Sequence, residues 1–423
     1  MLKNLLSLLR TPNLRKKVFI IFLLLVVFRI MATIPLPNVD QNQLQLFLTS
    51  NQIFGLFNVF TGGAFKNISI ALLGIGPFIT ASIIMQLLTM VFPSLKELLN
   101  EGTEKERSKF MQYSRLLTVP LAALQGYGFL NLLSRQGVIV IASPLDLLRD
   151  LVIVVTASVF LMWLGELITE QKLGNGISLI IFAGIVIDFP REILQTIITV
   201  DPTRVPNMIA FFALALLTIV GVVFISRGER RIPVSYAKQV RGTKIYGGAS
   251  TYLPLKINQA GVIPIIFALS ILMFPQMISQ FLIGSQNQWL LKIALFFQGF
   301  NQDSLVYLLF YFGLVFLFTF FYTTVTFNPE TIAENLQKRG GFIPGYRPGQ
   351  TTSKHLVNTS NKVTLFGAIF LGIIAILPII MQQVTGITTF AIGGTSLLIM
   401  VTVAIETMDT IEAQLIMREY EIS

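Results

Sequence analysis

The sequence contains no cysteine and only one histidine, His355. Without cysteine there is no disulfide framework, no thiolate zinc site and no cysteine nucleophile. The histidine lies in a polar segment, so we expect neither histidine-based metal binding nor a histidine proton relay. A Gly-x-x-x-x-Gly-Lys-Ser/Thr phosphate loop is also missing. We therefore predict no catalytic residue, no metal and no cofactor, and any energy for the function must come from partners.

Charge is scarce as well. Asp, Glu, Lys and Arg make up 12% of the 423 residues, hydrophobic residues make up 53%, and the mean hydropathy is +0.73. This composition is typical of a polytopic membrane protein, because a soluble chain with so little charge would aggregate. Windows of about 17–25 apolar residues predict an all-α protein with ten transmembrane helices, at 18–34, 70–92, 110–132, 148–168, 176–190, 207–226, 258–281, 303–327, 363–383 and 387–406.

Basic residues are distributed unevenly between the predicted connections. If the N-terminus is cytoplasmic, the connections on that side hold most of the lysines and arginines, including two long basic loops at 227–256 and 328–362. The opposite connections hold only a few, namely Lys66, Arg135, Arg149, Arg191, Arg204 and Lys292. The positive-inside rule then predicts that both termini are cytoplasmic. The first span is too long for a signal peptide and no small-x-small cleavage site follows it, so we expect it to be retained.

Ten spans divide into two halves of five, at 1–190 and 191–423. An odd number of spans in each half makes the halves run in opposite directions across the membrane. That is the arrangement of an inverted repeat, with a pathway between the halves near the midplane. Sequence self-similarity is too weak to demonstrate the repeat, so it is a hypothesis.

The interiors of the second, sixth, seventh, eighth, ninth and tenth spans lack ionisable residues. Ion-coupled transporters usually need such groups inside the membrane, and intramembrane hydrolases need a nucleophile with its base. Their absence disfavours both classes, although a channel and a secondary transporter of small solutes remain open. Arg29, inside the first span, is the main exception, and we expect it to snorkel or to cap a helix end. Glu166 and Glu170 are expected to be solvated or paired with loop cations.

The stretch 57–93 combines a broken segment with a full span. Glycines 62 and 63 loosen its first part, and an uninterrupted apolar run follows the sequence Gly-Ile-Gly-Pro at 74–77. Irregular backbone at membrane depth survives only where protein or a water-filled cavity surrounds it, because lipid cannot satisfy bare N–H and C=O groups. We therefore expect this stretch to line a cavity inside the helical bundle.

Two isoleucine pairs are spaced four residues apart, Ile79 with Ile83 and Ile181 with Ile185, so that each pair shares a helix face. An apolar constriction of this kind would block water and ions by dewetting. A single isoleucine in a span, however, more often faces lipid or packs against a neighbouring helix. Periodicity alone does not decide between these interpretations.

A polar stripe runs beside the isoleucine face of the second span, with two candidate partners elsewhere: Ser82, Gln86 and Thr89, with Gln125 and Asn258. One interpretation is static hydrogen bonding between helices. The other is a seam between helices that opens.

The basic loops 227–256 and 328–362 are open to two interpretations as well. They are ordinary determinants of topology, or they dock on an acidic protein or on RNA phosphate. Their glycines and prolines favour fixed turns.

Long motifs along almost the whole chain resemble the SecY family, which provides the central subunit of the bacterial protein-conducting channel and includes Sec61-alpha. The matching segments are FRIMATIPLP (28–37), TGGAF (61–65), SIALLGIGPFITASIIMQLLT (69–89), MWLGELITEQKLGNGISLIIFAGIV (162–186), RRIPVSYAKQ (230–239), STYLPLKINQAGVIPIIFA (250–268), FNPETIAENLQKRGGFIPGYRPGQ (327–350) and GGTSLLI (393–399).

The resemblance implies two inverted halves closed like a clamshell around an hourglass pore, with an apolar ring at the waist. It assigns that ring to six isoleucines, Ile79, Ile83, Ile181, Ile185, Ile266 and Ile399. A plug helix that seals the pore falls at about 58–70, including Phe60, Thr61, Gly62, Gly63, Ala64 and Phe65. Ser82, Gln86, Thr89, Gln125 and Asn258 would line a lateral gate.

The resemblance also implies partners and a location. The basic loops would contact the SecA ATPase or the ribosome, through its protein and RNA phosphates, with Arg230, Arg231, Lys238, Arg241, Lys244, Lys338, Arg339 and Arg347. Small membrane subunits resembling SecE and SecG, signal sequences, nascent chains and lipid are the other expected partners. The expected location is the plasma membrane of a bacterium. The expected function is to translocate unfolded polypeptides and to release transmembrane segments sideways into lipid.

Overall fold

The computed structural model describes residues 12–40, 43–44, 61–100, 104–199, 205–236, 239–241, 244–246, 250–282, 287–298, 304–385 and 389–422, most of them helical. A helix occupies each of the ten predicted segments: α2 (Pro12–Thr33), α5 (Gly76–Val91), α7 (Glu104–Arg135), α8 (Pro144–Glu170), α9 (Gly176–Thr199), α10 (Val205–Arg227), α11 (Ile263–Leu282), α13 (Leu305–Thr326), α15 (Gln350–Thr385) and α16 (Thr389–Ile422). The helical membrane fold is thus confirmed for the bundle, whereas the two basic loops contain strands that were not predicted.

By length and composition, four stretches of the described residues can cross a membrane: Lys105–Arg135, Pro144–Glu170, Leu305–Lys338 and Gln350–Gln383. Shorter apolar helices occur at Gly76–Val91, Gly176–Pro190, Phe212–Arg227 and Ile263–Leu272. A ten-span count therefore stays a prediction.

Several predicted boundaries were wrong. The second span was predicted from residue 70, but residues 70–75 form turns, and α5 begins only at Gly76 with Pro77 in its first turn. Proline suits this position because the first helical N–H has no partner within the helix. The ninth and tenth spans were predicted too short, since α15 begins at Gln350 and α16 continues to Ile422. A hydropathy window finds apolar runs, so it misses the polar extensions of these helices.

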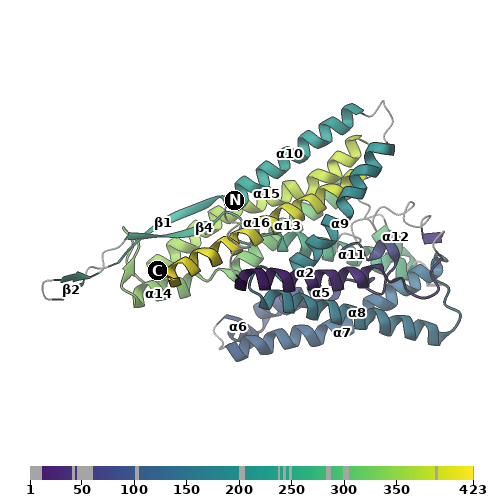
Figure 1. Cartoon of the computed structure of the whole chain (residues 1–423), viewed down its shortest axis with the longest axis horizontal. Helices are drawn as coiled ribbons and strands as arrows, with labels where there is room; N and C mark the ends of the chain where they lie inside the picture. The colour runs from purple at the N-terminus through teal and green to yellow at the C-terminus, as the bar shows by residue number, and fades with distance from the viewer. Residues whose placement is uncertain are drawn as a thin grey trace.

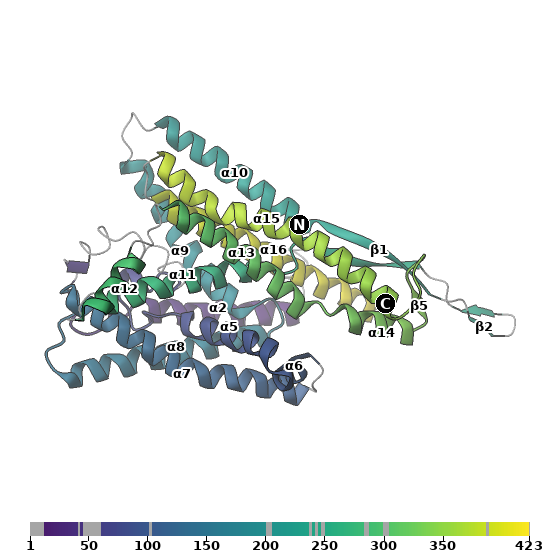
Figure 2. The same ribbon diagram turned by 180° about the vertical axis from the view of Figure 1, so that it is seen from behind.

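The helices form two groups with α9 and α11 between them. One group contains α2, α5, α7 and α8, and the other contains α10, α13, α15 and α16, as both side views show (Figures 1 and 2). The two groups meet where α5 and α7 contact α11 and where α9 contacts α16. Each of these contacts joins one predicted half of the chain to the other.

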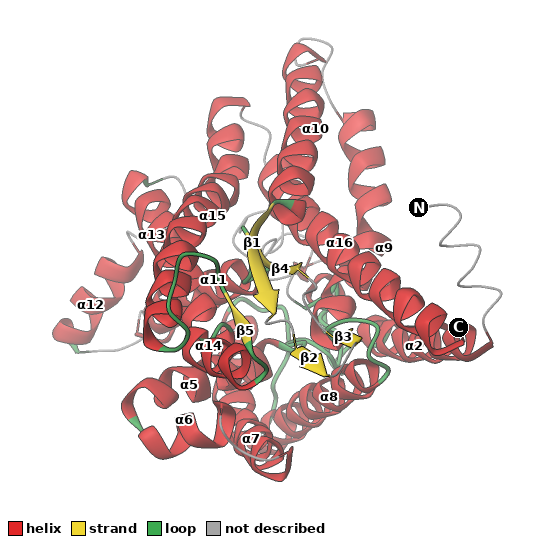
Figure 3. Ribbon diagram, turned by 90° about the vertical axis from the view of Figure 1, so that its left-hand side faces the viewer, coloured by secondary structure: helices red, strands yellow, loops and turns green. Residues whose placement is uncertain are grey.

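A β-rich projection, which we call the arm, extends from one end of the bundle. It consists of β1 (Glu229–Tyr236), β2 (Gln239–Arg241), β3 (Lys244–Tyr246), β4 (Ser250–Lys256), β5 (Gly341–Phe342) and the helix α14 (Pro329–Lys338). β1 pairs antiparallel with β4 and with β5, so the two basic loops form one structure. Viewed from that end, the strands project over the middle of the bundle (Figure 3).

The arm has a small core of its own. Ile232, Val234, Leu255, Ile343 and Leu356 are buried together, and alternate residues of β1 point into this cluster. The turn between β5 and α15 is fixed by a hydrogen bond from the Tyr346 N–H to the Ile343 carbonyl (3.0 Å). A turn of the predicted kind is therefore present in the second basic loop.

The described beginning and end of the chain lie at the same end of the bundle as the arm. Leu14 of α2 packs against Leu173 and, on α16, Ile411 and Leu415. The base of the arm is tied to α16 as well, through an ion pair between Lys256 Nζ and Asp409 Oδ2 (3.1 Å). This arrangement agrees with the prediction that both termini are on the side of the basic loops.

Candidate functional site

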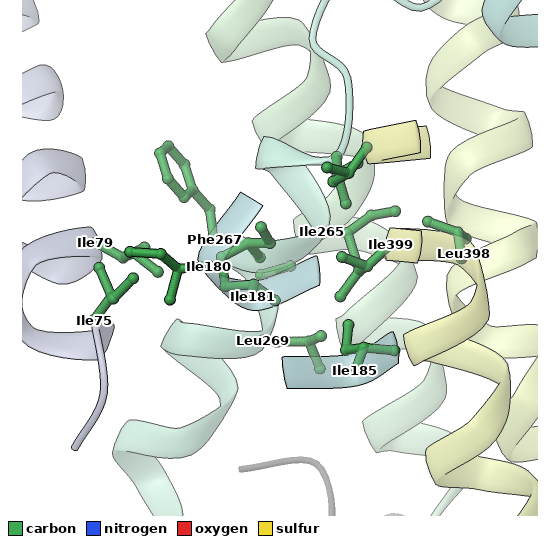
Figure 4. Close-up of a cluster of buried hydrophobic side chains, with 14 of the residues drawn as sticks. Ile75, Ile79, Ile180, Ile181, Ile185, Ile265, Phe267, Leu269, Leu398 and Ile399 are labelled. Atoms are coloured by element: carbon green, nitrogen blue, oxygen red, sulfur yellow. The ribbon is translucent and has the colours of Figure 1, made fainter. Parts of the chain in front are cut away.

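The six isoleucines singled out in the sequence lie in one buried apolar cluster. We call these six residues the waist. They come from four helices: Ile79 and Ile83 from α5, Ile181 and Ile185 from α9, Ile266 from α11, and Ile399 from α16. Each is at most 5% exposed, and Ile181 and Ile399 are completely buried. Several of them converge with neighbours such as Phe267 and Leu398 in Figure 4. The fold therefore brings together residues that are far apart in the sequence.

The six waist side chains carry no charge. α5 and α11 contain no ionisable residue along their full length, and branched apolar side chains offer neither water nor an ion a hydrogen-bonding partner. A closed constriction of this kind excludes water by dewetting rather than by a charge filter. A buried ionised group would also require a partner of opposite charge or a shift to its neutral form.

The first described residues of the expected plug pack against the waist. Phe60 lies outside the described residues, whereas Thr61, Gly62, Gly63, Ala64 and Phe65 are all buried. We refer to residues 61–75 as the plug segment. Its Ala64 belongs to the same apolar cluster as the six isoleucines. Gly184, which lies between the waist residues Ile181 and Ile185 on α9, touches the backbone of Gly62.

The described part of the plug is not the helix that the family resemblance implied. Residues 61–75 form turns around a single short 3-10 turn, Phe65–Asn67. Gly62 and Gly63 have positive φ values of 63° and 85°, which side-chain-bearing residues rarely adopt. The Thr61 hydroxyl accepts a hydrogen bond from the Phe65 N–H (3.1 Å), which closes the first turn. The glycine pair thus explains why the chain turns here instead of forming a helix.

Arg29 neither snorkels nor caps a helix end, contrary to expectation. Its Nη2 lies 3.5 Å from Oδ1 of Asp188 on α9, and both side chains are largely buried. Sequence analysis missed this pair, although an aspartate within a predicted span is itself a signal that a partner is needed. Glu166 was also misassigned, because it pairs with Arg115 of α7 at 2.7 Å rather than with a loop cation.

The polar stripe of α5 is confined to its own helix. Gln86 Nε2 donates to the Ser82 hydroxyl (3.3 Å), and the Thr89 hydroxyl donates to the Gln86 carbonyl (2.6 Å). Among the described residues, neither Gln125 nor Asn258 forms a hydrogen bond with this stripe. Asn258 instead donates to the Gly261 carbonyl (3.2 Å) just before α11. The hypothesis of static hydrogen bonds across the seam is therefore wrong for these residues.

Two of these amide side chains have an unused acceptor. The side-chain oxygens of Gln86 and Asn258 are buried and have no hydrogen-bond partner. A buried acceptor without a partner costs about 1–3 kcal/mol. Water or another hydrogen-bond donor would satisfy these oxygens better than their present surroundings do.

The arm presents exposed basic side chains. Arg230, Arg231, Lys338, Arg339 and Arg347 are exposed, and Arg347 lies in the turn that leads into α15, where its carbonyl accepts from the Thr352 hydroxyl (2.9 Å). Two of these cations have acidic neighbours, Glu229 beside Arg231 and Glu334 beside Lys338. Lys238 lies outside the described residues. For Arg241 and Lys244 the structure describes the backbone, which places them in β2 and β3.

Taken together, fold and site define a multi-pass membrane protein whose helices close around an uncharged apolar waist. A sequence profile of the SecY family matches residues 69–408. The "Protein translocase subunit SecY" of Thermus thermophilus is 43% identical, covering 100% of this chain and 97% of the relative. The protein of the same name from Mycobacterium tuberculosis is 42% identical, covering 100% and 99%. The chain belongs to the SecY family.

Solved structures share the fold at low sequence identity. The structure of "a protein conducting channel" has a TM-score of 0.65 at 19% identity, covering 94% of this chain and 91% of the other. Sec61 in the canine ribosome-channel complex has a TM-score of 0.61 at 18% identity, with coverage of 94% and 91%. At this level of identity the likeness concerns the fold alone.

Proposed function

We propose that this chain forms the protein-conducting channel of a protein translocase. The observation that carries the proposal is the waist: six buried isoleucines from both halves of the chain, on helices of which α5 and α11 hold no charge. Membership of the SecY family agrees with this function. A secondary transporter of small solutes, the alternative, should place ionisable groups at the midpoint of its route, where this chain has isoleucine.

In this proposal the waist and the plug segment seal the channel at rest. Isoleucine side chains can fit around an extended polypeptide without offering it hydrogen bonds, so the translocated polypeptide can slide through. A signal sequence or transmembrane segment enters between α5 and α11, where buried amide acceptors make the closed contact weak. Segments apolar enough to prefer lipid leave sideways, and polar segments continue across, as insertion energies predict.

The opening itself is a hinge motion of residues 1–190 against 191–423. Interfaces between packed helices are bistable, so small local changes are amplified into rotation of one body against another. The contacts of α5 and α7 with α11 and of α9 with α16 cross this boundary. An inverted repeat in the two halves would place the pathway between them, near the midplane.

The arm supplies the docking surface for the energy source. Its exposed cations, including Arg230, Arg339 and Arg347, suit acidic protein surfaces or RNA phosphate. The partners proposed are the SecA ATPase and the ribosome, and the Sec61 neighbour was solved in a ribosome-channel complex. Small subunits resembling SecE and SecG complete the assembly. The proposed location is the plasma membrane of a bacterium, with the arm and both termini in the cytoplasm.

Reconstitution tests this function directly. The chain, co-purified with its small subunits, is placed in proteoliposomes with SecA, ATP and a labelled preprotein that carries a signal sequence. We expect the preprotein to become protected from added protease, and a preprotein without its signal sequence to remain accessible. Uptake of small solutes without protection of the preprotein would overturn the proposal in favour of a transporter.

A further inference from the structure

The plug segment is held against α9 by a contact between two glycines. Gly184 of α9 lies so close to Gly62 that a Cβ on Gly184 would overlap the Gly62 backbone. A Cβ on Gly62 itself would come within 2.5 Å of Cζ of Phe28 on α2. The backbone of Gly62 therefore occupies a slot between α2 and α9 that admits no side chain on either facing backbone.

The Arg29–Asp188 ion pair lies against the next residue of the plug segment, Gly63. A Cβ on Gly63 would overlap the Asp188 carboxylate and come within 3.1 Å of Nη1 of Arg29. That Nη1 is buried and has no hydrogen-bond partner, and the ion pair itself is long, with Nη2 and Oδ1 3.5 Å apart. The plug segment thus covers a buried ion pair whose hydrogen bonding is incomplete.

The two features have opposite effects on closure. Backbone contact between glycines gains dispersion energy, because many atoms come within contact distance in a dry interface. Covering an ion pair removes it from water, and the desolvation penalty can exceed the Coulombic gain, especially where hydrogen bonds are missing. When the plug segment leaves, water reaches the pair and removes that penalty.

We propose that Gly184 and the Arg29–Asp188 pair form the seat of the plug segment, with the glycine contact holding the segment closed and the covered ion pair keeping it releasable. This inference rests on the proposed function, since it concerns how a sealed channel is held sealed. It makes the closed state metastable rather than maximally stable. A signal sequence then needs to supply only part of the free energy of plug release.

The test uses the absence of native cysteine. Ala64, in the plug segment, is completely buried, and an Ala64→Cys variant carries the only thiol in the chain. Its labelling rate by a membrane-impermeant maleimide, in the assembled complex in proteoliposomes, reports how often the plug segment leaves its seat. Ion conductance of the same vesicles without preprotein gives a second readout.

In this background Gly184→Ala should increase the labelling rate about tenfold or more, because the added methyl group overpacks the slot. The matched control is Gly313→Ala on α13, where the structure shows open space around the position of the Cβ. This control should label at the background rate, which is the rate of the Ala64→Cys variant without a further change. Equal rates for Gly184→Ala and Gly313→Ala would overturn the role of the glycine contact.

Two changes to the ion pair should alter the labelling rate in opposite directions. Asp188→Asn leaves the Arg29 guanidinium under the plug segment without a counter-charge, so labelling should increase. Replacing both partners, with Arg29→Met and Asp188→Leu together, removes the desolvation penalty, so labelling should fall below the background rate, by about threefold or more. A double variant that labels as fast as the background or faster would overturn the role of the pair.

Translocation by the unaltered chain separates this inference from the proposed function. If that chain protects a preprotein but the variants label as their controls do, the seat is wrong and the channel stands. If the unaltered chain translocates no preprotein, the proposed function fails, whatever the labelling rates. Protection of the preprotein by each variant confirms that it has folded, because only a folded channel translocates.

Discussion

The waist and the arm are built in opposite ways. The waist draws residues from four helices spread over most of the chain, and its six isoleucines are buried and uncharged. The arm is assembled from the two basic loops, its core holds five buried apolar residues, and its outer face is exposed and basic. In the function proposed above, the waist acts through packing, which salt does not screen, whereas the arm acts through charge, which salt screens.

This difference suggests a division of labour. A barrier to ions must not attract them, so charge is excluded from the waist. A docking surface must find its partner quickly, and charge complementarity chiefly increases association rates and specificity. The ion pair between Lys256 and Asp409 joins the base of the arm to α16, the helix that carries Ile399. The two regions are therefore separate in chemistry but joined by one helix.

The largest effect is expected from a polar residue in the waist. Ile399→Asn places an amide where the side chain is completely buried, and an unpaired amide there costs about 2–7 kcal/mol. Water entry relieves that cost, so the seal should fail. We expect increased ion conductance of proteoliposomes and passage of preproteins with defective signal sequences.

Ile399→Val is the matched control, since it keeps the site apolar and removes a single methylene group, at a cost of about 0.5–1.5 kcal/mol. Its conductance should stay close to that of the unaltered chain. Ile83→Asn should resemble Ile399→Asn from the other half of the chain. Unchanged conductance and unchanged signal stringency in both asparagine variants would remove the waist from the sealing mechanism.

A cavity in the arm should weaken the arm and spare the waist. Leu255 is 1% exposed in the arm core, and Leu→Ala at such a site costs about 2–5 kcal/mol. Limited proteolysis from the arm side should cut Leu255→Ala faster, while ion conductance stays low. Tyr252→Ala, at an exposed position of the same strand, should be cut as slowly as the unaltered chain. A leaking Leu255→Ala channel would show that the two regions are not independent.

The sequence predicted the presence of helices better than their ends, and the composition of the site better than its contacts. Long apolar runs identify α8 and α13 because lipid demands such runs. The polar first turns of α15 give no such signal. The partner of Arg29 lies on α9, far along the chain, so no local pattern could reveal it. The waist was assigned by family resemblance, since one isoleucine in a span resembles any other.

Charge reversal at the exposed turn of the arm should affect docking alone. Arg347→Glu replaces an exposed cation at the turn before α15. Exchanging one favourable charge contact for a repulsive one should weaken the affinity for SecA about tenfold, or by about 1.4 kcal/mol. We expect slower SecA-driven export of a preprotein and a smaller effect on membrane insertion. Lys292→Glu, on α12 (Gln288–Gln298) at the opposite end of the bundle (Figure 1), should leave export unchanged. Equal export rates for the Arg347 and Lys292 variants would contradict a docking role for this turn.

The smallest effect is expected where the arm's cations have acidic neighbours. Glu334 lies 3.4 Å from Lys338 on α14, and both side chains are mostly exposed, so the pair contributes no more than about 0.5 kcal/mol to stability. Glu334→Gln should leave the arm's resistance to protease unchanged but add one net positive charge to its surface. SecA should then bind slightly tighter, by about twofold or less at low salt, and the gain should disappear as salt shortens the Debye length to about 3 Å at 1 M. A gain that persists at high salt would mean that the introduced amide makes a direct contact rather than changing the electrostatic field of the arm.

The waist carries no charge, so the ion conductance of the closed channel should not change across the same salt series, once it is corrected for the conductivity of the buffer. A seal that weakened with salt would show that charge holds the channel closed.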